Sequence, residues 1–204
     1  MSTPLFWYEQ IYGERYKRAE GAGQPTWYKS LQCHTPIPQG WRPPSYSIHG
    51  SGAWPDWMAS WVPLWSERAL DILGPLVQGS CEFIPWVDEP KHRYWLVNVL
   101  SLVPQANWSC EQSSCYSGTF ASADGIEVFG TAIPPIFRLG GYTGKTFVSD
   151  EVARTSVASR LRGVAFVHPS IHWAETVFRS YKFGRSGTGF VSPNSDDSRA
   201  VMDA

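Results

Sequence analysis

The chain has 204 residues, a formal net charge of −1, 43% hydrophobic residues and 17% charged residues. This composition is typical of a globular protein, and the near-zero charge excludes a global field that would attract nucleic acid or an anionic membrane. No apolar run approaches the roughly 20 residues that span a bilayer, and the start, MSTPLFWYEQ, lacks the basic and then apolar pattern of a secretory signal. We therefore expect a cytoplasmic protein with reduced cysteines, no nucleic-acid partner and no membrane partner.

The first half of the chain is dominated by aromatic residues and proline. An aromatic run opens residues 4–18 and predicts a first strand, whereas residues 25–63 are dense in Pro and Trp and favour extended segments and turns over helices. Ser66 then precedes the helical pattern ERALDIL, where its hydroxyl can cap the first turn, and the Gly74-Pro75 pair ends the pattern. The following stretch, CEFIPWV, predicts a strand.

The second half of the chain shows the same order of a serine, a short helical segment and a strand. HRYWLVNVLSLV, residues 92–103, predicts a strand at the centre of a sheet, and the polar residues that follow predict a long loop or hairpin. IEVFGTAIPPIFRL predicts one or two strands interrupted at Pro134-Pro135. Ser149 then precedes a second short helix, which we expect Gly163 to end before the strand VAFVHP.

Together these elements predict the α+β class in a single domain over residues 1–190. We expect a mixed, mostly antiparallel sheet, two serine-capped helices and long Pro- and Trp-rich loops, with the segment Leu96–Leu102 near the centre of the sheet. Residues 191–204 are small and polar and predict a C-terminal tail.

No strong catalytic or metal-binding pattern is present in the sequence. Ser66 and Ser149 lie outside any G-x-S-x-G turn, so we interpret both as structural caps. A zinc site from Cys33, His34, Cys110 and Cys115 is conceivable, but the usual C-x2-C spacing is absent, which favours ordinary thiols. Cys110 and Cys115 would pair only in an exported chain. We expect no catalytic residue, no metal and no cofactor.

Taken in order, six segments resemble a known family. They are PIPQGWRPPSY, WSERALDIL, CEFIPW, YWLVNVLSLV, IFRL and FVSDEVARTSVASRLRGVAFV. Their order and spacing resemble the myxobacterial-type immunity protein family of bacterial polymorphic toxin systems, formerly a domain of unknown function. The resemblance covers roughly residues 36–167.

The residues that carry the resemblance are Trp41, Pro43, Pro44, Ser66, Glu67, Phe83, Pro85, Leu96, Asn98, Val99, Leu100, Phe137, Arg138, Ser149, Asp150, Leu161, Gly163 and Phe166. The chain departs from the family pattern in the Cys- and Ser-rich segment 104–124 and after residue 168. The resemblance implies a protein without catalytic activity that binds a cognate toxin domain in the cytosol and occludes its active site. The toxin would be a nuclease or a nucleotide-modifying enzyme.

Two segments outside the matched residues are candidate toxin-binding surfaces. The first is the loop around residues 107–120, where Trp108, Glu111 and Tyr116 combine an aromatic anchor, a charge and a polar aromatic. The second is the stretch Trp54–Trp61, in which Trp54 and Trp57 are the candidates, with burial of Trp57 and Trp61 in the core as the open alternative. Two alternatives stay open: an aromatic-rich module that binds carbohydrate or protein, and an unrecognised hydrolase.

Overall fold

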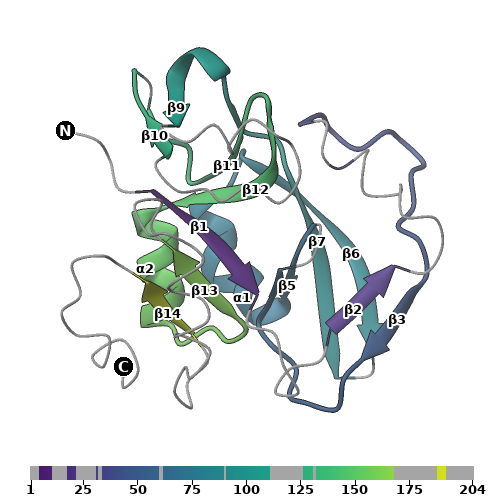
Figure 1. Cartoon of the computed structure of the whole chain (residues 1–204). Coiled ribbons are helices and arrows are strands. Elements are labelled where there is room, and N and C mark those ends of the chain that lie inside the picture. The colour runs from purple at the N-terminus through teal and green to yellow at the C-terminus, as the bar shows by residue number, and fades with distance from the viewer. Residues whose placement is uncertain are drawn as a thin grey trace.

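A computed structural model of the chain describes residues 5–10, 18–21, 31, 34–59, 62–89, 91–110, 126–130, 132–167 and 188–191. Within these residues the fold is α+β with mostly antiparallel sheets, which confirms the predicted class (Figure 1). The helices are α1 (Glu67–Leu73) and α2 (Asp150–Ala158), with the 3-10 turns η2 (Gly74–Leu76) and η3 (Gln105–Asn107).

The described strands form two larger sheets and two pairs. One sheet has the order β4 (Trp57–Ala59), β5 (Pro63–Ser66), β7 (His92–Val99) and β6 (Cys81–Glu89), all antiparallel. The other has the order β14 (Thr188–Val191), β13 (Val164–Val167), β1 (Leu5–Gln10), β12 (Tyr142–Ser149), β11 (Ile136–Leu139) and β8 (Leu102–Val103). Its contacts β13–β14 and β11–β8 are parallel.

The two strand pairs lie apart from these sheets. β9 (Trp108–Cys110) pairs with β10 (Ile126–Val128) at the top of the view, and β2 (Arg18–Gly21) pairs with β3 (Tyr46–His49) at the lower right, beside β6 (Figure 1). Val191 ends β14, one residue beyond the domain end expected from the sequence. Residues 192–204, which hold the rest of the predicted tail, lie outside the described residues.

The segment Leu96–Leu102 is divided between the two sheets. β7 lies inside the four-stranded sheet between β5 and β6, as expected, but it ends at Val99. The Leu100 amide then donates to the Ser80 carbonyl, and Leu102 belongs to β8, the edge strand beside β11. The expectation of one sheet centred on this segment is wrong, because a continuous apolar run reports burial and does not mark where a strand changes its partner.

Both helices begin at the predicted serines. The Ser66 hydroxyl accepts from the Ala69 amide at 3.2 Å, and the Ser149 hydroxyl accepts from the Val152 amide at 3.4 Å. Glu67 lies in the first turn of α1, and Asp150 and Glu151 lie in that of α2, where their negative charges interact favourably with the positive end of the helix dipole. Each serine therefore satisfies an orphan amide of the first turn and starts its helix.

The second helix ends earlier than Gly163. α2 ends at Ala158, and Arg160 turns the chain with a φ of 53°, in the left-handed region that non-glycine residues rarely adopt. Gly163 also has a positive φ, of 99°, but it lies in the next turn, beside Pro55 and Trp57. The glycine is required by this close approach of two segments and not by the helix end.

The core has two parts, one on each face of the four-stranded sheet. The inner cluster joins both sheets and both helices; it contains Trp57, Trp65, Val97, Val99, Ile136, Val148, Val152, Val164 and Phe166. The outer cluster packs between the sheet and residues of the 31–54 segment; it contains Leu31, Met58, Leu64, Trp86, Tyr94 and Leu96. Alternate residues of β7 enter the two clusters, so this strand is buried on both faces.

Candidate functional site

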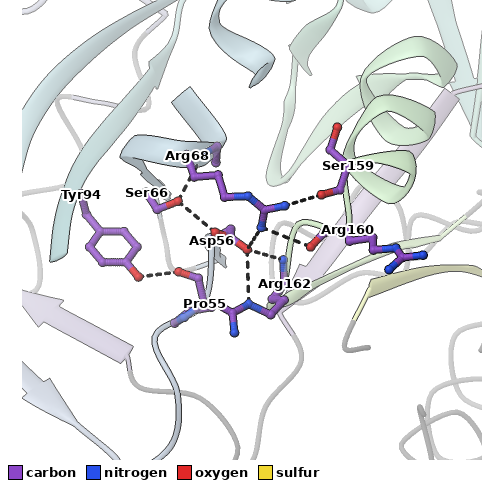
Figure 2. Close-up of polar contacts among 9 residues, drawn as sticks. Pro55, Asp56, Ser66, Arg68, Tyr94, Ser159, Arg160 and Arg162 are labelled. Carbon is purple, nitrogen blue, oxygen red and sulfur yellow. Dashed lines mark hydrogen bonds and ion pairs between the residues drawn. The ribbon is translucent and has the colours of Figure 1, made fainter. Parts of the chain in front are cut away.

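The stretch Trp54-Pro55-Asp56-Trp57 carries the most connected polar group in the described part of the chain. Asp56 is 5% exposed, and its carboxylate lies between the start of α1 and the turn that follows α2 (Figure 2). Its Oδ2 accepts from the Arg162 amide at 2.9 Å and from Arg68 Nη1 at 3.0 Å. Its Oδ1 accepts from the Ser66 hydroxyl at 3.4 Å. We call these four residues, Asp56, Ser66, Arg68 and Arg162, the aspartate clamp.

Backbone hydrogen bonds reinforce the clamp. The Arg162 carbonyl accepts from the amides of Asp56 and Trp57 at 2.9 and 3.0 Å, and the Ser66 amide donates to the Asp56 carbonyl at 2.8 Å. Asp56 is therefore bonded through both its backbone and its side chain to two segments distant in sequence. These bonds join the four-stranded sheet to the turn that leads into β13.

Arg68 extends the clamp to the end of α2. Its Nη2 donates to the Ser159 carbonyl at 2.5 Å, and its Nη1 donates to the Arg160 carbonyl at 3.4 Å (Figure 2). The last carbonyls of a helix have no intrahelical partner and carry partial negative charge. One guanidinium on α1 therefore satisfies the end of α2 while it also pairs with the Asp56 carboxylate.

The contacts of the aspartate clamp indicate a structural role for its charged groups. One carboxylate faces two guanidinium groups, and the neighbouring Tyr94 hydroxyl donates to the Pro55 carbonyl. Burial raises the pKa of Tyr94, so this hydroxyl stays protonated and acts as a donor. The carboxylate already accepts four hydrogen bonds, which suits it to hold three segments together and leaves it poorly placed to act as a general base.

Trp54 and Trp57, the two predicted interface candidates of this stretch, lie in different surroundings. Trp54 is partly buried, and its ring stacks on His92 and Tyr94 with centroid distances of 4.7 and 5.5 Å. Trp57 is 0% exposed in the inner cluster, where its ring packs against Trp65. Trp57 is therefore a core residue, and the expectation that it takes part in an interface is wrong.

Because Trp57 is buried, Trp54 and Trp57 cannot together form an exposed aromatic surface that stacks on a sugar. Such a surface needs exposed aromatic faces side by side, whereas Trp54 packs against the outer cluster and Trp57 belongs to the inner one. Trp54 is partly buried, whereas Trp57 is fully buried.

Trp108 is buried, contrary to the exposure that its polar sequence neighbours predict. Its side chain is 4% exposed, and its indole Nε1 donates to the Gly140 carbonyl at 3.0 Å. The reason is tertiary: β9 pairs with β10 and lies against the loop between β11 and β12, so the ring is covered by chain distant in sequence. Glu111 and Tyr116, the other two candidates of this loop, lie outside the described residues.

A second polar cluster, formed by Asn98 and Glu82, contacts the segment that follows His34. Asn98 is 0% exposed, and its Nδ2 donates to the Thr35 carbonyl and to Glu82 Oε2, both at 3.0 Å. The same Glu82 oxygen accepts from the Ile37 amide at 2.9 Å. Asn98 and Glu82 are paired across β7 and β6, so the sheet presents them together as an anchor for the 34–37 segment.

His34 and Cys81 are the titratable groups near the buried Arg138. Burial lowers the pKa of His34, and the Arg138 charge lowers it further. Burial raises the pKa of the Cys81 thiol to about 12, although Arg138 opposes this shift. Cys81 therefore stays protonated at neutral pH and is a poor nucleophile.

Metal and membrane sites can be addressed only for the described residues. Among them, no three His, Cys, Asp or Glu side chains gather closely enough to hold a metal ion. Cys33 and Cys115 of the conceivable zinc set lie outside this part of the chain. Within the same ranges, no helix combines the length and the apolar character needed to cross a bilayer.

The chain matches no protein-family model and no curated protein sequence. The site is therefore interpreted from its own geometry. Sequence reasoning missed Asp56, Arg68 and Arg162 as a unit. The signal that could have found Asp56 is an acidic residue flanked by Trp and Pro in an apolar stretch, since such a carboxylate is buried only when it is paired.

Proposed function

We propose that the protein is an immunity protein that binds a cognate polymorphic toxin domain in the cytosol and neutralises it by covering its active site. The proposal rests on the ordered resemblance described above and is an argument by analogy. The observation that supports it most is that several matched residues from separate segments, among them Phe137, Leu161 and Phe166, are buried in the packed frame of the fold, as expected of positions that determine a family's fold.

The frame can be followed residue by residue. Ser66 and Ser149 cap the two helices, and Phe137 and Phe166 are fully buried. Gly163 has a positive φ, and a Cβ there would lie 2.4 Å from the Pro55 Cβ. Residues of this kind determine the fold and leave the exposed surface free to vary, which is what a family of binders with different partners requires.

Inhibition by this mechanism needs no chemistry from the protein. A rigid surface that is complementary to the rim of the toxin's active site excludes substrate for as long as the complex lasts. The aspartate clamp and the inner cluster provide rigidity, because they tie both sheets and both helices together. Rigid partners lose less conformational entropy when they bind, which favours a tight complex.

The experiment is co-expression with a toxin domain encoded beside this chain. Growth of the producing cells is measured with the toxin alone, with the toxin and this protein, and with the toxin and an unrelated immunity protein as a control. We expect this protein alone to restore growth, and the purified pair to elute as one stoichiometric complex. Growth arrest in its presence, together with separate elution of the two proteins, would contradict the proposal.

The alternatives make different predictions in the same preparation. A carbohydrate-binding module would bind soluble glycans with a change in Trp fluorescence and would leave toxicity unchanged. A hydrolase would inactivate the toxin catalytically, so a small amount of this protein would suffice for an excess of toxin. Stoichiometric protection distinguishes occlusion from both.

A further inference from the structure

Three arginines emerge together where the aspartate clamp reaches the surface. Arg68 Nη1 and Arg162 Nε lie 3.0 and 3.5 Å from the same Asp56 oxygen, and each of these two side chains is 49% exposed. Arg160 is exposed, and Figure 2 shows its side chain running away from Asp56. We call Arg68, Arg160 and Arg162 the arginine face.

The arginine face carries excess positive charge. Arg68 and Arg162 share the one buried Asp56 carboxylate, and the Arg160 side chain points away from it, whereas Arg93 and Arg154 elsewhere each have an aspartate of their own. Among the described residues, no other acidic group forms an ion pair with the arginine face. Guanidinium has five N–H donors in a planar fork that matches a carboxylate, so exposed donors remain on this face for an acidic partner.

Two arginines of the face are also held in position before any partner binds. Arg68 is fixed at both terminal nitrogens by Asp56 and the Ser159 carbonyl, and Arg162 Nε lies 3.5 Å from Asp56 Oδ2. Arginine side chains normally lose rotamer freedom when a partner immobilises them. For Arg68 and Arg162 part of that loss has already occurred on folding, so binding costs less.

We infer that the arginine face is the docking surface for an acidic region of the cognate toxin. This inference rests on the proposed function and specifies its surface. The excess charge determines the chemistry of the partner, and the ordered side chains explain why this region binds better than other exposed arginines do.

The test uses Arg160→Glu, because the Arg160 side chain lies outside the clamp and its replacement leaves the Asp56 contacts intact. The dissociation constant for the toxin is measured by calorimetry, with a melting curve for each variant. We expect binding about tenfold weaker at low salt, a smaller loss for Arg160→Gln, and a difference that shrinks in about 0.5 M NaCl.

The matched control is Arg42→Glu, which makes the same change of charge at an exposed arginine on the 34–48 segment. We expect its affinity to equal that of the wild-type protein. If Arg42→Glu and Arg160→Glu lost the same affinity for the toxin, the effect would come from net charge alone, and the inference would be overturned. Wild-type affinity in Arg160→Glu would also overturn it, while the proposed function would stand. If the wild-type protein fails to bind the toxin, the proposed function fails and the docking surface fails with it.

Discussion

The Asp56 carboxylate and the Arg162 backbone amide are joined by a 2.9 Å hydrogen bond across 106 residues of sequence. The Arg162 carbonyl returns the contact by accepting from the Asp56 amide at 2.9 Å. This reciprocal pair connects the strand β4 with the turn before β13, and so connects the two larger sheets. The carboxylate bond and the backbone bond therefore both hold these two segments together beside the inner cluster.

The first prediction concerns loss of the Asp56 carboxylate. Asp56→Ala should lower the free energy of unfolding by about 3 kcal/mol, because the Arg162 amide loses its acceptor and two guanidinium groups lose their counter-charge. Asp56→Asn should cost about 1.5 kcal/mol, since it keeps one acceptor oxygen and loses the charge. Denaturant unfolding measures both.

The control for this prediction is Asp88→Ala. Asp88 pairs with Arg93 at 3.4 Å, but its side chain is 83% exposed, so water screens the pair. We expect little change in stability. An equal effect of the two alanine substitutions would show that the clamp contributes no more than a surface ion pair.

The second prediction is that Gly163→Ala strongly destabilises the protein. A Cβ at this position would lie 2.4 Å from the Pro55 Cβ and 2.5 Å from the Trp57 carbonyl oxygen, and the φ of 99° strains any L side chain. We expect a loss of about 3 kcal/mol or more by thermal unfolding. Gly40→Ala is the matched control, since Gly40 has a φ of 83° with nothing within 4 Å. It should cost only about 1 kcal/mol, the cost of the strained backbone alone.

The third prediction separates the two caps. Ser149→Ala should lower stability by about 1 kcal/mol through the lost bond to the Val152 amide and leave partner binding intact. Ser66→Ala should cost more, because the Ser66 hydroxyl also donates to Asp56 Oδ1 at 3.4 Å. Ser149→Asp should keep the stability of the wild-type protein, because aspartate also caps helices. If Ser149→Ala protected cells less well against the toxin at unchanged stability, this serine would instead have a functional role.

The fourth prediction follows from the burial of Trp108. Trp108→Ala should lower stability by about 3 kcal/mol, as expected for a large side chain removed from a packed site. Trp108→Phe keeps an aromatic ring but loses the bond to the Gly140 carbonyl, and should cost about 1 kcal/mol beyond any change in packing. A melting temperature for Trp108→Ala equal to that of the wild-type protein would contradict this structural role.

The fifth prediction is a pH dependence of stability that arises from His34. Burial and the Arg138 charge lower the pKa of His34 in the folded protein, so the unfolded chain takes up the proton first as the pH falls. The contribution of His34 is present above its unfolded pKa of about 6.5 and is lost as the pH falls towards the lower folded pKa. We therefore expect stability to decline as the pH falls below about 7.5 and passes through the unfolded pKa towards the lower folded one.

The test of this titration is His34→Asn. His34 has a φ of 55°, in the left-handed region that asparagine tolerates, so the substitution removes the titrating ring with little backbone strain. The decline in stability should be shallower in the variant. Parallel curves for the two proteins would assign the pH dependence to the carboxylates alone.

Local features of the fold could be predicted from the sequence. Serine at 66 and at 149, each before acidic and apolar residues, predicted both helix starts, because a cap depends on atoms only three residues apart. Gly74-Pro75 likewise predicted the end of α1. The long apolar run after His92 predicted a strand inside a sheet, and β7 lies between β5 and β6.

The contacts between distant residues could not be predicted in this way, because they depend on how the whole chain packs. Trp108 has polar neighbours in sequence but is covered by the loop at Gly140, and Trp57 is covered by the inner cluster. The aspartate clamp joins residues from three separate segments, so no local pattern could reveal it. Periodicity and capping are short-range properties, whereas the burial of a charge or an indole depends on long-range packing, which is why the candidate site changed more than the fold class did.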